Sequence, residues 1–239
     1  MDKKQIYEYG QKIGFKKWQA EKDYLQHLVL KKIYDSDLPL VFKGGTCLQK
    51  VYGLYRFSTD LDFNSIGKNI DLINICDELG DQDIILKTKK IKKTKFSENY
   101  LFEFYSDNFK NSLTIQISLR EKIIKDKQPH TITTGYPIPP YILWAMNIEE
   151  ILAEKIRALL MRGFPRDLYD VWYLLSVKDI SINQELLLTK LDNVNLKFDK
   201  KILFHQIKKI EKDWDNEMGM LISAHPPFKE VFKELKSKV

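Results

Sequence analysis

The chain has 239 residues, of which 44% are hydrophobic and 30% are charged, so it can bury a sizeable core. This composition excludes a disordered or a fibrous protein. Lysine and arginine together number 39, against 33 aspartates and glutamates, which gives a formal net charge of +6. A positive excess of this size suits a phosphate-bearing substrate as well as a nucleic acid, so it does not decide between them.

The cysteines and histidines favour neither a disulfide scaffold nor a zinc site. Cys47 and Cys76 are the two cysteines and form no CxxC pair, and the four histidines lie far apart in the sequence. The N-terminus lacks the apolar run of a secretory signal, and no stretch approaches the roughly 18 apolar residues of a membrane span. We therefore expect a cytoplasmic protein, because thiols stay reduced in that compartment.

Hydrophobic periodicity and turn residues predict the elements of the front half of the chain. In chain order, we expect one or two helices over 4–34, a buried strand at 40–42, a helix over 46–53, a strand at 60–63, a helix near 69–80, and strands from residue 84, at 100–105 and at 113–119. Alternation is clearest in the last strand, where Leu113, Ile115 and Ile117 face one way.

A segment rich in proline and glycine, residues 133–141 (TTGYPIPPY), is expected to be a linker. Beyond it the periodicity is helical, with helices expected over 147–162, 166–176, 183–191, 199–217 and 226–237. These patterns predict an α+β chain. A mixed-sheet domain with the N-terminal helices would occupy residues 1–135, and a helical domain would occupy residues 136–239.

The most informative stretch is residues 43–46 (KGGT), which is followed by residues 60–62 (DLD). A glycine pair between a strand and a helix lets the backbone approach a phosphate, toward which the helix directs its free N–H groups. In a strand, Asp60 and Asp62 project from one face, and two such carboxylates repel unless a cation such as Mg²⁺ or Mn²⁺ joins them. A phosphate cradle with a metal-binding carboxylate pair is the equipment of nucleotidyl transfer.

Each motif alone has an ordinary structural explanation. A glycine pair is often only a turn, and an Asp-x-Asp is often a solvated strand edge, since short motifs match by chance. The combination of strand, glycine pair, helix and acidic strand, in that order, is much less common by accident.

The sequence VFKGGTCLQKVYGLYRFSTDLDF, residues 41–63, resembles the first motif region of the DNA polymerase β-like nucleotidyltransferases. More closely, it resembles the AbiEii/AbiGii-type toxin nucleotidyltransferases, which carry a lysine before the glycines, a serine or threonine after them, and an Arg-Phe-Ser segment that leads into Asp-x-Asp. The matching residues are Lys43, Gly44, Gly45, Thr46, Arg56, Phe57, Ser58, Asp60 and Asp62. Residues 148–175 (IEEILAEKIRALLMRGFPRDLYDVWYLL) are similar to the second characteristic block of that family.

This resemblance implies a polymerase β-like catalytic domain that moves an NMP from an NTP to an acceptor, with Mg²⁺ or Mn²⁺ as cofactor. It also implies the toxin of a type IV-like toxin–antitoxin or abortive-infection system, a form of phage defence, with an AbiEi-like antitoxin as a possible partner and tRNA or another RNA as acceptor. Asp60 and Asp62 would bind the metal. The residues that would bind the nucleotide are Lys43, Gly44, Gly45, Thr46, Arg56, Ser58 and Lys155.

Helical spacing places two charged residues of the second block in apolar surroundings. Lys155 falls within the apolar stripe of its helix, and Asp167 shares a face with apolar residues of the next helix. Such a pair either only pins two helices together or is catalytic, with Lys155 holding the triphosphate and Asp167 orienting Lys155 or assisting the acceptor. In related toxins the corresponding residues are regarded as active-site residues, which favours catalysis. We also expect Asp170 to lie within ion-pair reach of Arg166.

Two features leave alternatives open. The strand at 113–119 presents Gln116 where polymerase β-like enzymes commonly place a third metal-binding acid, so Glu103 or Glu121 substitutes for it, or a second metal is held weakly. The six lysines between Lys87 and Lys95 either contact an RNA backbone or form a solvated strand edge.

We therefore expect a metal-dependent nucleotidyltransferase with an RNA acceptor. In one alternative, the acceptor is a hydroxyl of a protein or a small molecule. In another, the chain is a non-catalytic RNA-binding module. The presence of both Asp60 and Asp62 disfavours the latter, because a site without function has no physical use for adjacent repelling charges.

Overall fold

The computed structural model describes residues 3–67, 70, 72–73, 85–106, 109–120 and 122–239. The chain divides into two compact units. The sheet unit comprises Met1–Val51, Ser58–Ile123 and Lys127–Ala145, and the helical unit comprises Tyr52–Phe57, Ile124–Asp126 and Met146–Val239. The domain division expected at residue 135 stays a prediction.

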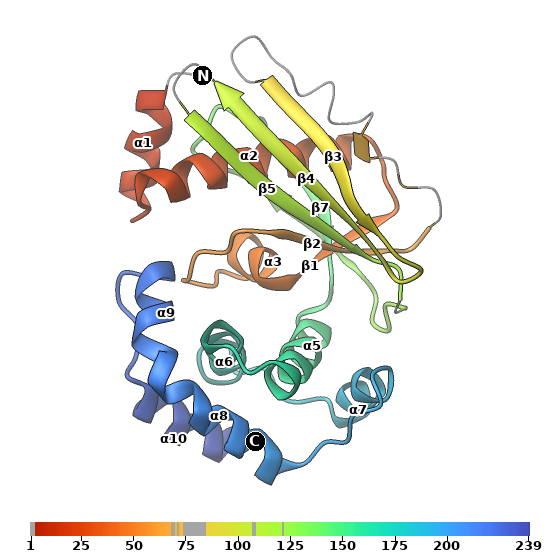
Figure 1. Cartoon of the computed structure of the whole chain (residues 1–239), viewed down its shortest axis with the longest axis vertical. Coiled ribbons are helices and arrows are strands. Elements are labelled where there is room, and N and C mark those ends of the chain that lie inside the picture. Colours follow the sequence, from red (N-terminus) through yellow and green to blue (C-terminus); the bar gives the residue numbers. More distant parts are fainter. Residues whose placement is uncertain (1–2, 68–69, 71, 74–84, 107–108, 121) are drawn as a thin grey trace. The chain divides into compact units, whose positions relative to one another are not determined.

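Seven strands in the described residues form one sheet in the order β3-β4-β5-β2-β1-β7-β6 (Figure 1). Their bounds are β1 Leu40–Lys43, β2 Leu61–Ser65, β3 Ile85–Lys93, β4 Ser97–Ser106, β5 Phe109–Ser118, β6 Gln128–Ile132 and β7 Tyr141–Ala145. The pairs β1–β7 and β2–β5 are parallel, and the other neighbours are antiparallel. The sheet is therefore mixed, and the α+β class expected from the sequence is confirmed.

Three described helices accompany the sheet: α1 Lys3–Lys12, α2 Lys17–Asp35 and α3 Gly44–Lys50. Helix α2 crosses the sheet in Figure 1 and contacts β5 and β7. It buries Leu25, Val29 and Ile33 almost completely. Since these residues recur at helical spacing, they hold α2 by one apolar face. The core continues through the sheet, where the rings of Phe42 and Phe63 lie 5.3 Å apart.

The helical unit contains α5 Ile148–Met161, α6 Pro165–Trp172, the π-turn η1 Tyr173–Val177, α7 Gln184–Asp192, α8 Lys200–Ile210, the 3₁₀ turn η2 Glu211–Asp213, α9 Trp214–Leu221 and α10 Phe228–Lys238. Helix α5 begins where the Asn147 side chain accepts a hydrogen bond of 3.0 Å from the Glu149 backbone N–H. It ends before Gly163, whose φ of 61° turns the chain toward Pro165 at the start of α6.

The linker prediction for residues 133–141 is wrong. These residues connect β6 to β7, which pair antiparallel from Gln128 opposite Ala145 to Ile132 opposite Tyr141. Proline cannot donate a backbone hydrogen bond, so its clustering marks the connection between two neighbouring strands here. Neither β6 nor β7 was expected from the sequence. Most of the helix expected at 69–80 lies outside the described residues.

Candidate active site

The turn from β1 into α3 depends on the conformation of Gly44. Its φ is 78°, in the left-handed region that glycine favours. A Cβ at this position would lie 2.3 Å from Asp62 Oδ2 and 2.9 Å from Asp62 Cγ. The backbone of the glycine bend therefore lies directly against the Asp62 carboxylate, and a larger residue would displace one or the other.

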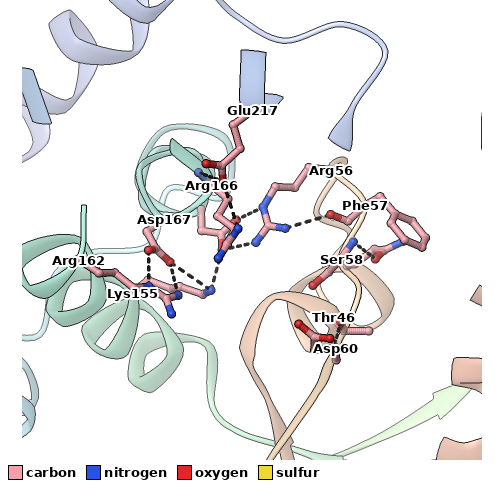
Figure 2. Close-up of polar contacts among 12 residues, drawn as sticks. Thr46, Arg56, Phe57, Ser58, Asp60, Lys155, Arg162, Arg166, Asp167 and Glu217 are labelled. Carbon is pink, nitrogen blue, oxygen red and sulfur yellow. Dashed lines mark hydrogen bonds and ion pairs between the residues drawn. The ribbon is translucent and has the colours of Figure 1, made fainter. Parts of the chain in front are cut away.

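Asp60 directly precedes β2, and a hydrogen bond joins its backbone to the helix that follows the glycine bend. The Thr46 hydroxyl, which is completely buried in α3, donates a hydrogen bond to the Asp60 carbonyl oxygen (Figure 2). The Asp60 carboxylate accepts a hydrogen bond of 3.2 Å from the Thr59 hydroxyl. Between the two acids, Leu61 is fully buried, so Asp60 and Asp62 project from the opposite face of the chain.

Asp62 belongs to a row of polar residues that crosses one face of the sheet. Its Cα partner on β1 is Lys43, and its partner on β5 is Gln116. Gln116 lies opposite Asn99 on β4, which in turn lies opposite Lys92 on β3. Residues paired in this way present their side chains on the same face, so Lys43 and Gln116 flank Asp62.

Gln116 stands beside Asp62 on the adjacent strand, the place proposed from the sequence for a third acid. Glu103 does not substitute there, because it lies opposite Ser112, about 13 Å along β5 from Gln116. The Glu103 carboxylate instead lies 3.9 Å from Lys89 Nζ. Glu121 is outside the described residues.

Oxygen atoms form the donor set at this bend. Within the described part of the chain, no three or more His, Cys, Asp and Glu residues are grouped so as to hold a metal ion. Two carboxylates and a neighbouring amide oxygen nevertheless suit Mg²⁺, which commonly binds through one or two carboxylates together with substrate phosphates. The oxygen atoms of Asp60, Asp62 and Gln116 thus fit a metal site in which the phosphates of a bound nucleotide supply further ligands.

Two further residues lie near the carboxylate pair. Burial lowers the pKa of Lys22 in α2, and the nearby Asp60 carboxylate opposes that shift. Lys22 is therefore a neighbour of Asp60 that the sequence did not indicate. Cys47 is fully buried, and burial and Asp62 both raise the pKa of its thiol. Cys47 is therefore a neutral packing residue and not a nucleophile.

Ser58 contributes its backbone to the sheet unit. Its N–H donates to Gln49 Oε1 at 3.0 Å, and its carbonyl oxygen accepts from Gln26 Nε2 at 2.9 Å. These bonds hold the chain just before Asp60, and the role of Ser58 in nucleotide binding stays a prediction.

A second group of expected residues lies in the helical unit around Lys155 of α5. The Lys155 side chain is 12% exposed, and its Nζ lies 2.8 Å from Asp170 Oδ2. Its distance to Asp167 Oδ1 is 3.9 Å (Figure 2). The expected contact between Lys155 and Asp167 is therefore the longer of two, and Asp170 is the closer partner.

Asp170 is completely buried and accepts two parallel hydrogen bonds from Arg56. Arg56 Nε and Nη2 lie 2.6 Å from Asp170 Oδ1 and Oδ2. Burial would raise the pKa of Asp170, but Arg56 and Lys155 outweigh it and lower that pKa, so the carboxylate is ionised. Arg56 is itself 2% exposed. Arg166 Nη1 lies 3.3 Å from Glu217 Oε1, and the expected reach between Arg166 and Asp170 stays a prediction.

Asp167 forms an ion pair with a different arginine, Arg162. Arg162 Nε and Nη2 donate to its two carboxylate oxygens at 2.7 and 2.9 Å (Figure 2). The sequence analysis missed the part played by Arg162 and by Asp170. The three-residue spacing of Asp167 and Asp170 could have placed both on one helix face. The contact of Arg162 with Asp167 could not be predicted from the sequence, because helical periodicity does not continue across the turn at Gly163.

Comparisons with known proteins identify the family of the chain. Residues 29–234 match the model of a family described as the nucleotidyl transferase AbiEii toxin of type IV toxin–antitoxin systems. The chain belongs to this family. The AbiEii-family chain is thus a nucleotidyltransferase toxin, as its motifs led us to expect, with an NTP as substrate and an antitoxin as partner.

Two solved structures share the fold of this AbiEii-family chain. JHP933 from Helicobacter pylori is 23% identical, with a TM-score of 0.61, and the match covers 92% of this chain and 89% of that one. MenT4, a nucleotidyltransferase toxin from Mycobacterium tuberculosis H37Rv, is 15% identical, with a TM-score of 0.65, and the match covers 100% of this chain and 88% of that one. A search of curated proteins finds no match. Among the residues that the structure describes, no helix has both the length and the apolar character to cross a membrane.

Proposed function

We propose that this AbiEii-family enzyme transfers an NMP from an NTP to an RNA acceptor and requires Mg²⁺ or Mn²⁺. The observation that carries the proposal is the contact between the Gly44 backbone and the Asp62 carboxylate, with Asp60 attached to the same bend through Thr46. Asp60, Asp62 and Gln116 would hold the metal, which when bound neutralises charge on the reacting phosphates.

The chain's own groups supply the remaining roles in the proposal. The backbone of Gly44 and Gly45 approaches the phosphates, while the missing Cβ of Gly44 leaves room for the Asp62 carboxylate. Lys43, beside Asp62, adds a positive charge at the same bend. In the helical unit, Lys155 binds the triphosphate and Asp167 supports the reaction. Thr46 and Ser58 would contribute to nucleotide binding by holding the bend and the residues before Asp60.

RNA is the acceptor that the lysines of β3 favour. Lys87, Lys89 and Lys92 lie opposite Glu103, Leu101 and Asn99, so they belong to the sheet face that carries Gln116 and Asp62. Lys90 and Lys93 lie on the other face, 2.7 and 3.1 Å from the carboxylate of Glu98. On one face of this segment Lys90 and Lys93 pair with Glu98. The other face carries Lys87, Lys89 and Lys92 against the acid Glu103, 3.9 Å from Lys89, and it adjoins the Asp62 row. A phosphate backbone suits the latter.

The proposal is tested by incubating the purified protein with each α-labelled NTP, Mg²⁺, total cellular RNA and protein extract. We expect label on RNA, and we expect Asp60→Asn and Asp62→Asn to reduce it by at least about a hundredfold, because each removes a metal-binding charge. Thermal unfolding should occur at the wild-type temperature or above it, since each substitution removes repulsion between neighbouring acids.

The same variants serve in cells, where they should lose growth inhibition. Equal toxicity of wild type and both variants would contradict the catalytic assignment. Label on protein or on a small molecule would replace RNA as the acceptor and leave the metal-dependent transfer in place. Raised salt should weaken binding of an RNA acceptor steeply, because lysine–phosphate contacts release counterions.

A further inference from the structure

The charges around Lys155 do not balance. Asp167 is paired through two hydrogen bonds with Arg162, and Asp170 is paired through two hydrogen bonds with Arg56. These two pairs are formally neutral, so the ammonium of Lys155 is a third positive charge beside two carboxylates that already have arginine partners.

The geometry of Lys155 leaves donors for a ligand. An ammonium carries three N–H donors, and the 2.8 Å contact with Asp170 uses one of them. The 3.9 Å separation from Asp167 is too long for a hydrogen bond. Because the side chain is only 12% exposed, its charge is poorly screened by water, and an anionic ligand would be strongly attracted to it.

We propose that Asp170 and Arg56 are positioning residues for Lys155. Asp170 fixes the ammonium at 2.8 Å, while Arg56 neutralises Asp170, so that the charge of Lys155 remains available for the triphosphate of the NTP. This inference rests on the proposed role of Lys155 and moves the orienting role from Asp167 to Asp170. It also explains why Arg56, which is buried, need not touch the nucleotide.

An arginine suits this position better than a lysine. Its planar fork gives two parallel hydrogen bonds, which hold the Asp170 carboxylate in one orientation, whereas a lysine offers a point charge. Asp170 then presents Oδ2 to both Arg56 and Lys155. The orientation of one carboxylate thus sets the position of the ammonium.

The test is a double-mutant cycle read by calorimetric binding of inorganic triphosphate with Mg²⁺, together with the KM for NTP. We expect Lys155→Ala and Asp170→Asn each to weaken triphosphate binding by about tenfold or more, as expected for loss of a charged hydrogen bond. The double variant should bind no more weakly than Lys155→Ala, because Asp170 acts through Lys155.

The Asp170→Asn result separates positioning from simple electrostatics. Removal of a negative charge beside the ammonium should by itself strengthen binding of an anion. Weaker binding therefore indicates loss of position. A milder variant, Arg56→Lys, keeps the charge and should weaken triphosphate binding by about fivefold, which preserves the test if Asp170→Asn does not fold. Glu149→Gln is the control variant. Glu149 lies on the same helix as Lys155 but pairs with Lys125, so this variant should bind triphosphate as wild type does.

The outcomes distinguish the inference from the proposed function. Wild-type or tighter triphosphate binding by Asp170→Asn, with weakened binding by Lys155→Ala, would overturn the positioning role and leave the function of Lys155 standing. Additive losses in the double variant would also overturn it, since they would show that Asp170 acts independently of Lys155. Wild-type binding by Lys155→Ala would overturn both.

Discussion

At the scale of single residues, the contact between Gly44 and Asp62 restricts which amino acids the candidate site tolerates more than any other feature described above. Gly44 combines a positive φ with a carboxylate oxygen where a Cβ would be. Either property alone has a moderate cost, because a left-handed conformation costs an L-residue roughly 1–2 kcal/mol. Together they make the bend and the acid interdependent, so a substitution at one moves the other.

We predict that Gly44→Ala lowers transfer activity by at least about tenfold, with a loss of about 1–2 kcal/mol in the free energy of unfolding. The added methyl group would displace the Asp62 carboxylate, which is one of the proposed metal ligands. The measurements are Mn²⁺ titration, the transfer rate and urea unfolding.

Gly14→Ala is the matched control for this prediction. Gly14 has the same φ of 78°, but no heavy atom lies within 4 Å of its Cβ position. The control should therefore lose similar stability and keep both Mn²⁺ binding and transfer. Equal activity of Gly44→Ala and wild type would show that the Asp62 position is not needed.

At the scale of elements, the register of the strands determines which polar residues stand beside Asp62. Asp62, Lys43 and Gln116 come from three strands that are distant in sequence, and their pairing alone brings them side by side. A shift of one residue in β5 would replace Gln116 by an apolar neighbour, because strand side chains alternate between faces. The residue that stands beside Asp62, and is the proposed third metal ligand, thus depends on the pairing of β2 with β5.

Gln116→Glu is predicted to strengthen Mn²⁺ binding by about tenfold, because a third carboxylate adds negative charge beside Asp62. Mn²⁺ titration of the protein without nucleotide measures this effect. Ser118→Glu is the control, since Ser118 lies opposite Asn64 and one pair further along the same face. Equal gains in the two variants would indicate a general charge effect and would count against Gln116 as a neighbour of the metal.

At the scale of the whole molecule, each unit contains a buried network of charges in addition to its apolar core. In the sheet unit, Lys50 Nζ lies 2.6 Å from Asp23 Oδ1, and His27 Nδ1 lies 2.9 Å from the Tyr141 hydroxyl. In the helical unit, Lys190 is fully buried and lies 2.6 Å from Glu150 Oε1. Such networks are costly to break, since removal of one partner leaves a buried charge.

The buried His27 gives the stability of the chain a pH dependence with a defined sign. Burial and the nearby Lys50 charge outweigh Asp23 and lower the pKa of His27 from 6.5 to about 3. The unfolded chain therefore takes up a proton below pH 6.5 that the folded chain does not. Stability from this group is fully present above pH 6.5 and is lost as the pH falls toward 3.

We predict that wild type loses about 1.6 kcal/mol more stability than His27→Gln between pH 6.5 and pH 5, because the slope rises over this range from half to nearly the full value of about 1.4 kcal/mol per pH unit. Urea unfolding of both proteins across this range gives the two slopes. The pKa of Asp23 is also lowered, since the charge and hydrogen bond of Lys50 outweigh the effect of burial. Asp23 therefore titrates below its ordinary pKa of 3.8, outside this pH window. Identical slopes would show that His27 is protonated in the folded chain.

Local patterns in the sequence were sufficient for several features of the fold and of the site. The alternation around Leu61 placed Asp60 and Asp62 on one face, and the apolar stripe of α5 indicated that Lys155 is nearly buried. The motifs also indicated the family that the comparisons confirm. These features depend on the period of a strand or a helix, which is a property of neighbouring residues.

Only the tertiary structure showed which distant segments meet. Arg56 and Asp170 are 114 residues apart, and no periodicity links them. The contact of Gly44 with Asp62, the position of Gln116 beside Asp62 and the pairing of β6 with β7 likewise result from long-range packing and strand register. Residue spacing specifies which face a side chain occupies, but the side chain that it contacts is chosen by the energetics of the whole packed chain.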